Sequence, residues 1–132
     1  MISAVIDTSA LIRLYVPDGP VPDGLEKFIG AACKAESVLL IPELALAEAA
    51  QVLWKKERDK YLSPSETDEI ICAIMELPLE IISHYNILPH ALNIARKHGI
   101  TVYDSIFAAC AKRKNAILFT ADNRLKKVFD IL

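Results

Sequence analysis

Four carboxylates occupy positions where a core or strand-end residue would be expected: Asp7, Glu48, Asp104 and Asp122. If they share one pocket their charges repel, since two unit charges about 4 Å apart interact by on the order of 4 kcal/mol at an effective dielectric of about 20. Such a pocket needs protons or a divalent cation. Ligation by oxygen alone selects Mg²⁺ or Mn²⁺, and the absence of histidine and cysteine from these positions argues against zinc.

Glu48 is the clearest of the four signals. It lies within the predicted helix 42–58, where its neighbours three and four positions away are apolar except for Gln51. A carboxylate is almost never fully buried without a partner, and no lysine or arginine lies within one helical turn. Glu48 therefore lies at the margin of the buried face, meets a buried base, or lines a cavity that holds a cation.

The three aspartates precede predicted helices. Asp7 follows the apolar strand 2–6, Asp122 follows the strand 116–119, and Asp104 precedes the apolar stretch 105–111. Each alone is most simply a helix N-cap. The carboxyl ends of parallel strands meet at one edge of a sheet, which is where ligands bind in open α/β folds. The three aspartates and Glu48 could thus converge there.

The elements that must position these acids alternate between strands and helices. We expect strands at 2–6, 38–41, 79–82 and 116–119, a short extended segment at 101–103, and helices at 10–15, 25–34, 42–58, 64–76, 88–98, 104–114 and 122–129. This order predicts one α/β domain, residues 1–132, with a mainly parallel sheet. The proline and glycine cluster 17–24 is a loop, and its Asp18 is expected to play no part in the site. Neither glycine-rich phosphate loop is present, which argues against ATP or dinucleotide binding of those kinds.

Composition narrows the class of protein. Of the 132 residues 53% are apolar, yet no run is long enough to span a membrane and no signal peptide is evident, so we expect a soluble, cytoplasmic protein. The three cysteines are far apart and have apolar neighbours, which predicts core residues rather than disulfides. The formal charge of −2 gives no global attraction to nucleic acid, so a polyanionic substrate needs local basic patches or a bound cation.

Four segments closely resemble, in order and spacing, the motifs of PIN-domain ribonucleases, and in particular the VapC toxins of toxin–antitoxin pairs. They are VIDTS at 5–9, PELALAEAAQVLWK at 42–55, HGITVYDSIFAACAKR at 98–113 and LFTADNRL at 118–125. The resemblance covers essentially the whole chain. It implies a PIN-like three-layer fold, with a mainly parallel central sheet flanked by helices.

The same resemblance implies an activity and places its residues. The metal-binding acids of the family fall on the four carboxylates above, which would hold one or two Mg²⁺ or Mn²⁺ ions for hydrolysis of RNA phosphodiester bonds. Ser9 and Thr120 match hydroxyl positions of the family and would orient the acids. Gln51 stands where relatives often carry asparagine, and it would orient Glu48 less rigidly.

Basic residues and partners complete this expectation. Candidates for RNA contact are Arg13, Lys112, Arg113, Lys114 and Arg124, although the run 112–114 could equally be a solvated helix end stabilised by the dipole. As a VapC-type toxin the chain would form a homodimer, through the helices after Pro42 and Pro64. A VapB-type antitoxin would offer arginine or lysine to the carboxylates.

Three other functions remain open. A PIN-like fold that has lost catalysis could bind only RNA or protein, but retention of all four acids argues against it. An acid-pocket Mg²⁺ phosphohydrolase usually has a second aspartate two residues after the first one. This chain has Ser9 at that position, which argues against this class. A purely structural module would leave Glu48 unexplained.

Overall fold

The sheet has four parallel strands, and the strand that ends at Asp7 lies in its interior. In the computed structural model, which describes all residues from Met1 to Leu132, the strand order is β3-β2-β1-β4. The strands are β1 (Ile2–Ile6), β2 (Ser37–Pro42), β3 (Leu79–Ile82) and β4 (Ile117–Phe119). Val5 pairs with Leu40 on one side and with Leu118 on the other. All four carboxyl ends therefore point to one edge, as predicted.

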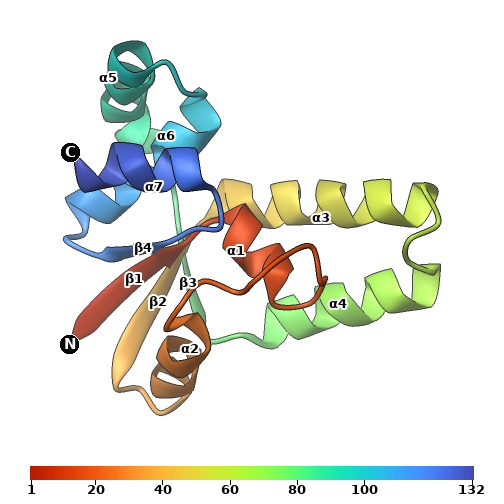
Figure 1. Cartoon of the computed structure of the whole chain (residues 1–132). Coiled ribbons are helices and arrows are strands. Elements are labelled where there is room, and N and C mark those ends of the chain that lie inside the picture. Colours follow the sequence, from red (N-terminus) through yellow and green to blue (C-terminus); the bar gives the residue numbers. More distant parts are fainter.

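Seven α-helices and one short 3-10 turn surround the sheet (Figure 1). They are α1 (Thr8–Arg13), α2 (Leu25–Cys33), α3 (Glu43–Arg58), α4 (Pro64–Glu76), η1 (Tyr85–Ile87), α5 (Leu88–His98), α6 (Val102–Arg113) and α7 (Asn123–Asp130). Helix α6 packs against β1, β2 and β4, with α5 and α7 packed on α6, whereas α2 packs on β2 and α1 on α3. Figure 1 shows α3 and α4 as a pair of helices extending away from the sheet. The predicted parallel sheet flanked by helices is confirmed.

Burial explains why β1 and α6 form the centre of the core. Ala4, Val5 and Ile6 are completely buried, as expected for a strand covered on both faces. Residues 105–111 of α6 are all buried as well, so this helix is apolar around its whole circumference at the middle of the fold. None of the helices is both long and apolar enough to cross a bilayer.

The start of α6 corrects one prediction. Residues 101–103 are not an extended segment: Thr101 is the N-cap, its Oγ1 accepts from the backbone N–H of Asp104 at 3.0 Å, and Val102 is already helical. The β-branched and aromatic residues of this short run suggested a strand, but propensity over three residues is overridden by a good cap. Asp104 is therefore in the first turn of the helix rather than its cap, so its carboxylate does not cap α6.

The prediction that all three cysteines belong to the core is wrong for two of them. Cys110 is buried in α6, and burial raises the pKa of its thiol to about 11. Cys33 and Cys72 are exposed, because they lie on the outward faces of α2 and α4. All three are free thiols.

Candidate active site

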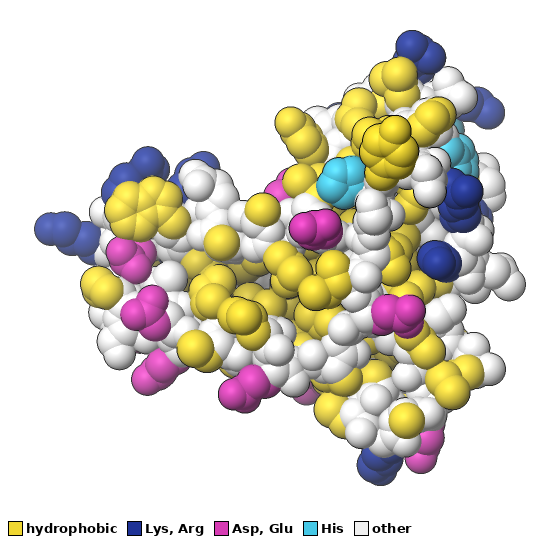
Figure 2. Space-filling model, turned by 180° about the vertical axis from the view of Figure 1, so that it is seen from behind, with side chains coloured by type: hydrophobic (Ala, Val, Ile, Leu, Met, Phe, Trp, Pro, Cys, Tyr) yellow, Lys and Arg dark blue, Asp and Glu magenta, His cyan; other side chains and the backbone are white.

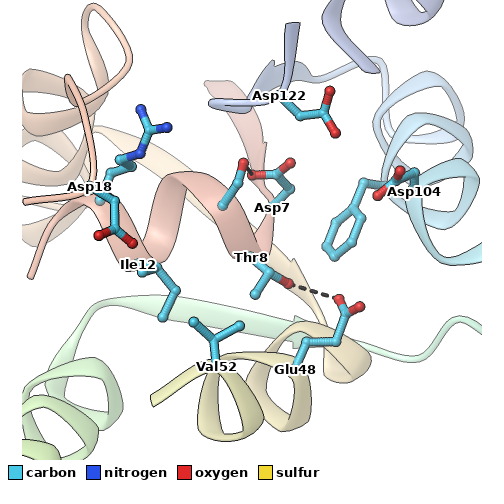
Figure 3. A pocket seen from close by; sticks show the side chains of 11 residues that line it. Asp7, Thr8, Ile12, Asp18, Glu48, Val52, Asp104 and Asp122 are labelled. Atoms are coloured by element: carbon cyan, nitrogen blue, oxygen red, sulfur yellow. Dashed lines mark hydrogen bonds between the residues drawn. The ribbon is translucent and has the colours of Figure 1, made fainter. Parts of the chain in front are cut away.

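A cavity of about 350 Å³ opens at the carboxyl edge of the sheet, and all four predicted acids line it. Its lining comprises Asp7, Thr8, Ser9, Ile12, Arg13, Asp18, Glu48, Val52, Asp104, Phe107 and Asp122. Figure 3 shows Asp7 near the centre, with Asp104 and Asp122 on one side of it and Glu48 below. The four acids come from the end of β1, from α3, from α6 and from the start of α7. The topology thus brings together residues that are up to 115 positions apart (7 to 122).

Asp7 is the most deeply buried acid of the cavity, with 4% of its surface exposed. Its Oδ1 accepts from Ser9 Oγ at 2.8 Å and from the backbone N–H of Ala10 at 2.9 Å, and its Oδ2 accepts from Thr120 Oγ1 at 2.5 Å. Burial raises the pKa of Asp7, the three hydrogen bonds oppose that rise, and the charge of Asp104 adds to it. Asp7 both caps α1 and faces the cavity, so its interpretation as a helix N-cap is compatible with its interpretation as an acid of the shared pocket.

Ser9 and Thr120 join the segments that follow β1 and β4. Besides donating to Asp7, Ser9 Oγ accepts from the backbone N–H of Ala121 at 2.9 Å. Thr120 Oγ1 accepts from the backbone N–H of Asp122 at 3.0 Å. The two hydroxyls thereby set the orientation of Asp7 and the path of the backbone that leads to Asp122.

Glu48 is held by Thr8, which sequence reasoning missed. Thr8 Oγ1 donates to Glu48 Oε1 at 2.8 Å, a bond between α1 and α3 (Figure 3). Gln51 is exposed and makes no hydrogen bond to Glu48, so the expected orienting role of Gln51 is wrong and Thr8 takes its place. The signal that the sequence offered was the position of Thr8 directly after Asp7.

Asp104 and Asp122 lie on the α6 and α7 side of the cavity. Asp122 caps α7, its Oδ1 accepting from the backbone N–H groups of Arg124 at 2.9 Å and Leu125 at 3.1 Å. Burial raises the pKa of Asp104, and so does the neighbouring charge of Asp122, while the hydrogen bond with Thr101 and the charge of Arg124 lower it. The surroundings of Asp104 as a whole therefore disfavour its ionised form.

The predicted basic residues divide into two groups. Arg13 lines the cavity and donates from Nη1 to the carbonyl of Pro20 at 3.0 Å, and Arg124 donates from Nη2 to the carbonyl of Gly99 at 2.7 Å beside Asp104. Lys112, Arg113 and Lys114 are at the opposite end of α6, roughly 12–15 Å from Asp104 at 1.5 Å per residue. This run does not line the cavity, because α6 leads away from the sheet edge where the acids meet, and its contact with RNA stays a prediction.

Asp18 is a cavity residue, contrary to the expectation that it plays no part. It lines the cavity on the side opposite Asp104 and forms an ion pair with Lys56 Nζ at 2.8 Å (Figure 3). The contact depends on how the 17–24 loop folds back over α3. No local pattern in the sequence encodes that path.

The donor chemistry of the cavity suits a hard divalent cation. The acidic side chains that line it are all carboxylates, and burial, with a smaller effect of neighbouring acids, raises the pKa values of Asp7 and Asp104. A bound cation would favour the ionised forms of both groups. No group of three such side chains is close enough to enclose an ion directly. Mg²⁺ keeps several waters and is commonly bound through one or two carboxylates, so a roomy cavity with separated acids is compatible with it.

We expect these two acids to make the metal-free protein less stable as the pH rises above their unfolded pKa of about 4. A carboxyl whose pKa is raised by folding binds its proton more tightly in the native state, so its contribution is complete below the unfolded pKa of about 4 and is lost through the folded pKa. Denaturant unfolding in EDTA at several pH values measures this. Asp104→Asn should flatten the dependence, and an unchanged slope in that variant would contradict it.

Comparison with known proteins agrees with this geometry. Residues 4–130 match the PIN domain family. The chain belongs to the PIN-domain family. It is 32% identical over 130 residues to Ribonuclease VapC3 of Pyrobaculum aerophilum, covering 97% of this chain and 95% of that one. The resemblance to VapC proteins that the four motifs indicated is therefore confirmed over nearly the whole length.

Solved structures share the fold of this PIN domain. PAE2754 from Pyrobaculum aerophilum superposes with a TM-score of 0.75 at 22% identity, over 96% of this chain and 79% of that one. VapBC2 from Rickettsia felis, bound to a DNA fragment from its promoter, gives 0.69 at 17% identity over 96% and 93%. Mycobacterium tuberculosis VapC20, a toxin that cleaves the sarcin-ricin loop, gives 0.64 at 12% identity over 94% and 93%. At these identities the likeness establishes the architecture alone.

Proposed function

We propose that this PIN domain is a Mg²⁺- or Mn²⁺-dependent endoribonuclease, the toxin of a VapBC-type toxin–antitoxin pair. The observation that carries the proposal is the meeting of Asp7, Glu48, Asp104 and Asp122 around one cavity at the sheet edge. A chain 32% identical to a VapC ribonuclease over 97% of its length supports the reaction class. The acid-pocket phosphohydrolase and the inactive binding module lack comparable support.

The residues of the cavity can be assigned roles in that reaction. The four acids would hold one or two cations, one or two carboxylates by direct contact and the others through the waters of the metal. When bound, such a cation lowers the pKa of a water and offsets the charge of the scissile phosphate. Ser9 and Thr120 fix the carboxylate of Asp7, and Thr8 fixes that of Glu48. Arg13 and Arg124 provide positive charge at the rim, where an acidic pocket would otherwise repel the RNA backbone.

The direct test is hydrolysis of synthetic single-stranded RNA by the purified protein. We expect cleavage in Mn²⁺ or Mg²⁺ and none in EDTA, with products mapped by gel and mass spectrometry. A DNA strand of the same sequence and a nuclease-free mock purification serve as controls. Intact RNA after prolonged incubation with either metal would contradict the proposal.

An antitoxin would have to neutralise the same cavity. The Rickettsia felis relative was solved as VapBC2, and we extend that pairing to this chain. A segment offering arginine or lysine to Asp7 and its neighbouring acids would form charge-assisted hydrogen bonds and exclude both metal and RNA.

We also propose a homodimer formed through the α3–α4 pair. A groove of about 270 Å³ between these helices is lined only by apolar residues: Leu46, Ala49, Ala50, Ile71, Ile74 and Met75. Figure 2 shows hydrophobic side chains gathered along this pair and toward the middle of the molecule. Met75 is 78% exposed in the monomer. An apolar groove with an exposed methionine at its wall suits a subunit interface, whose core is richer in apolar groups than the rest of the surface.

Light scattering after size exclusion at micromolar concentration should therefore give twice the monomer mass. Met75→Glu should convert the protein to a monomer, since it places a charge at the centre of the apolar groove. Ile131→Glu, at a comparably exposed position outside α3 and α4, is the matched control and should remain dimeric. A monomeric wild type would remove the dimer but not the nuclease.

A further inference from the structure

A groove leads away from the acidic cavity along the end of α3. A hollow of about 270 Å³ is lined by Asp18, Val52, Lys55, Lys56, Asp59 and Tyr61, and it shares Asp18 and Val52 with the acidic cavity. A neighbouring hollow of about 530 Å³ is lined by Val16, Pro17, Asp18, Lys56, Tyr61 and Leu62. We call these two hollows, which share Asp18, Lys56 and Tyr61 in their linings, the α3 groove. It runs from the acids, past Val52, to Tyr61.

The α3 groove differs in charge from the acidic cavity, because two lysines and two aspartates balance in its lining. Its two carboxylates are already paired, Asp18 with Lys56 at 2.8 Å and Asp59 with Arg58, which lies outside the lining, at 3.5 Å. Lys55 is exposed and forms no ion pair. The ammonium group of Lys55 is therefore available to an anionic ligand. Lysines at a helix end are also favoured by the dipole, so charge alone does not establish a ligand site.

Tyr61 supplies an aromatic surface on a fixed turn. Lys60 adopts φ 65°, and the N–H groups of Lys60 and Tyr61 bond to the carbonyls of Glu57 at 3.0 Å and Lys56 at 2.9 Å. This is the Schellman arrangement, with lysine where glycine is usual. The Lys56 ammonium lies 5.9 Å from the Tyr61 ring centre, yet Tyr61 remains 78% exposed. The turn accounts for the position of Tyr61 but leaves its ring free for a partner.

Lysines beside an exposed ring match the way single-stranded nucleic acid is bound. Phosphates are held by cations, and bases stack on aromatic faces with little regard to sequence. From Glu48 to Lys55 the groove follows α3 for about 10 Å, at 1.5 Å per residue. An extended strand whose scissile phosphate is at the acids can therefore reach Lys55 and Tyr61 within a few nucleotides.

We infer that the α3 groove is a subsite for the RNA strand flanking the scissile bond, in which Tyr61 stacks a base and Lys55 and Lys56 contact phosphates. The inference rests on the proposed ribonuclease function and assigns the path of its substrate. In this inference Lys55 and Lys56, rather than residues 112–114 at the far end of α6, make the main basic contacts with RNA.

Photocrosslinking tests the contact without requiring hydrolysis. Single-stranded RNA carrying 5-iodouridine is bound in EDTA, irradiated, and the attached peptide identified by mass spectrometry. We expect attachment at Tyr61. In fluorescence anisotropy Tyr61→Ala should weaken binding roughly tenfold, whereas Tyr61→Phe, which keeps the stacking face, should stay within about twofold of wild type. Tyr85→Ala is the matched control, because Tyr85 is 79% exposed in η1, beside the far end of α6.

Cleavage kinetics separate the subsite from the catalytic function. With an RNA long enough to fill the groove, Tyr61→Ala and Lys55→Ala should raise KM and leave kcat nearly unchanged; with a dinucleotide both variants should match wild type. If wild type cleaves RNA but Tyr61→Ala shows unchanged affinity and KM, or the crosslink maps elsewhere, the subsite is wrong and the nuclease stands. If wild type cleaves no RNA the proposed function fails, and a crosslink outside the groove would then reject the subsite as well. Preferential binding of an acidic peptide over RNA at Tyr61 would also overturn it.

Discussion

Asp104→Asn should lower metal-dependent RNA cleavage by two to three orders of magnitude without unfolding the protein. Loss of a metal ligand removes several kcal/mol of transition-state stabilisation, and each about 1.4 kcal/mol corresponds to a factor of ten. The fold should tolerate the change, because Thr101, not Asp104, caps α6. In EDTA the variant should be at least as stable as wild type at neutral pH, since burial and Asp122 disfavour the charge that it removes.

Asp23→Asn is the appropriate control for this substitution. Asp23 is an exposed acid in the same proline and glycine loop as Asp18, but it does not line the cavity. Asp18→Asn would break the pair with Lys56 at the cavity wall and therefore cannot serve. Cleavage at the wild-type rate by folded Asp104→Asn protein would remove this residue from the site. The same outcome for Asp7→Asn would remove the mechanism.

Much of the fold was predictable because its signals are local. The apolar run 2–6 followed by Asp7 forms β1 as expected. The capping box of Ser63 and Glu66 starts α4, and Gly99 ends α5, near the bounds predicted for these helices. The segment 101–103 was misassigned because a good N-cap outweighs β propensity over so few residues. The cysteines were misassigned because apolar neighbours in sequence do not show which face of a helix is covered.

The candidate site follows the same rule: residues marked by a local sequence signal were predicted, and residues placed by contacts between distant segments were not. The four acids were identified because a charge in an apolar helix, or directly after a buried strand, is anomalous in the sequence itself. Thr8, Asp18 and Lys56 were missed since their roles come from contacts between segments that are distant in sequence: α1 with α3, and the 17–24 loop with α3. Gln51 was expected to orient Glu48 because it stands where relatives of the resembled family often carry asparagine, whereas in the structure Gln51 is exposed.

Divalent metal should stabilise the protein strongly against heat. A cation that binds only the native state adds about 2.7 kcal/mol at a concentration one hundred times its Kd. For a chain of 132 residues this corresponds to a rise in Tm of roughly 10 °C. The physical source is that burial and neighbouring acids disfavour the ionised forms of Asp7 and Asp104, which a bound cation would favour. Thermal unfolding in EDTA and in increasing MgCl₂ or MnCl₂ measures the effect.

The controls for this experiment separate ligation from screening. NaCl at matched ionic strength should give a much smaller shift, because general screening acts on all surface charges and not on this cavity in particular. Asp104→Asn should begin from an equal or higher Tm in EDTA and gain less from metal, so that its melting curve and that of wild type approach or cross as metal is added. Asp23→Asn should follow wild type throughout. A Tm that responds equally to MgCl₂ and to matched NaCl would mean that the four acids do not share a cation, and metal-assisted hydrolysis at this cavity would then have no physical basis.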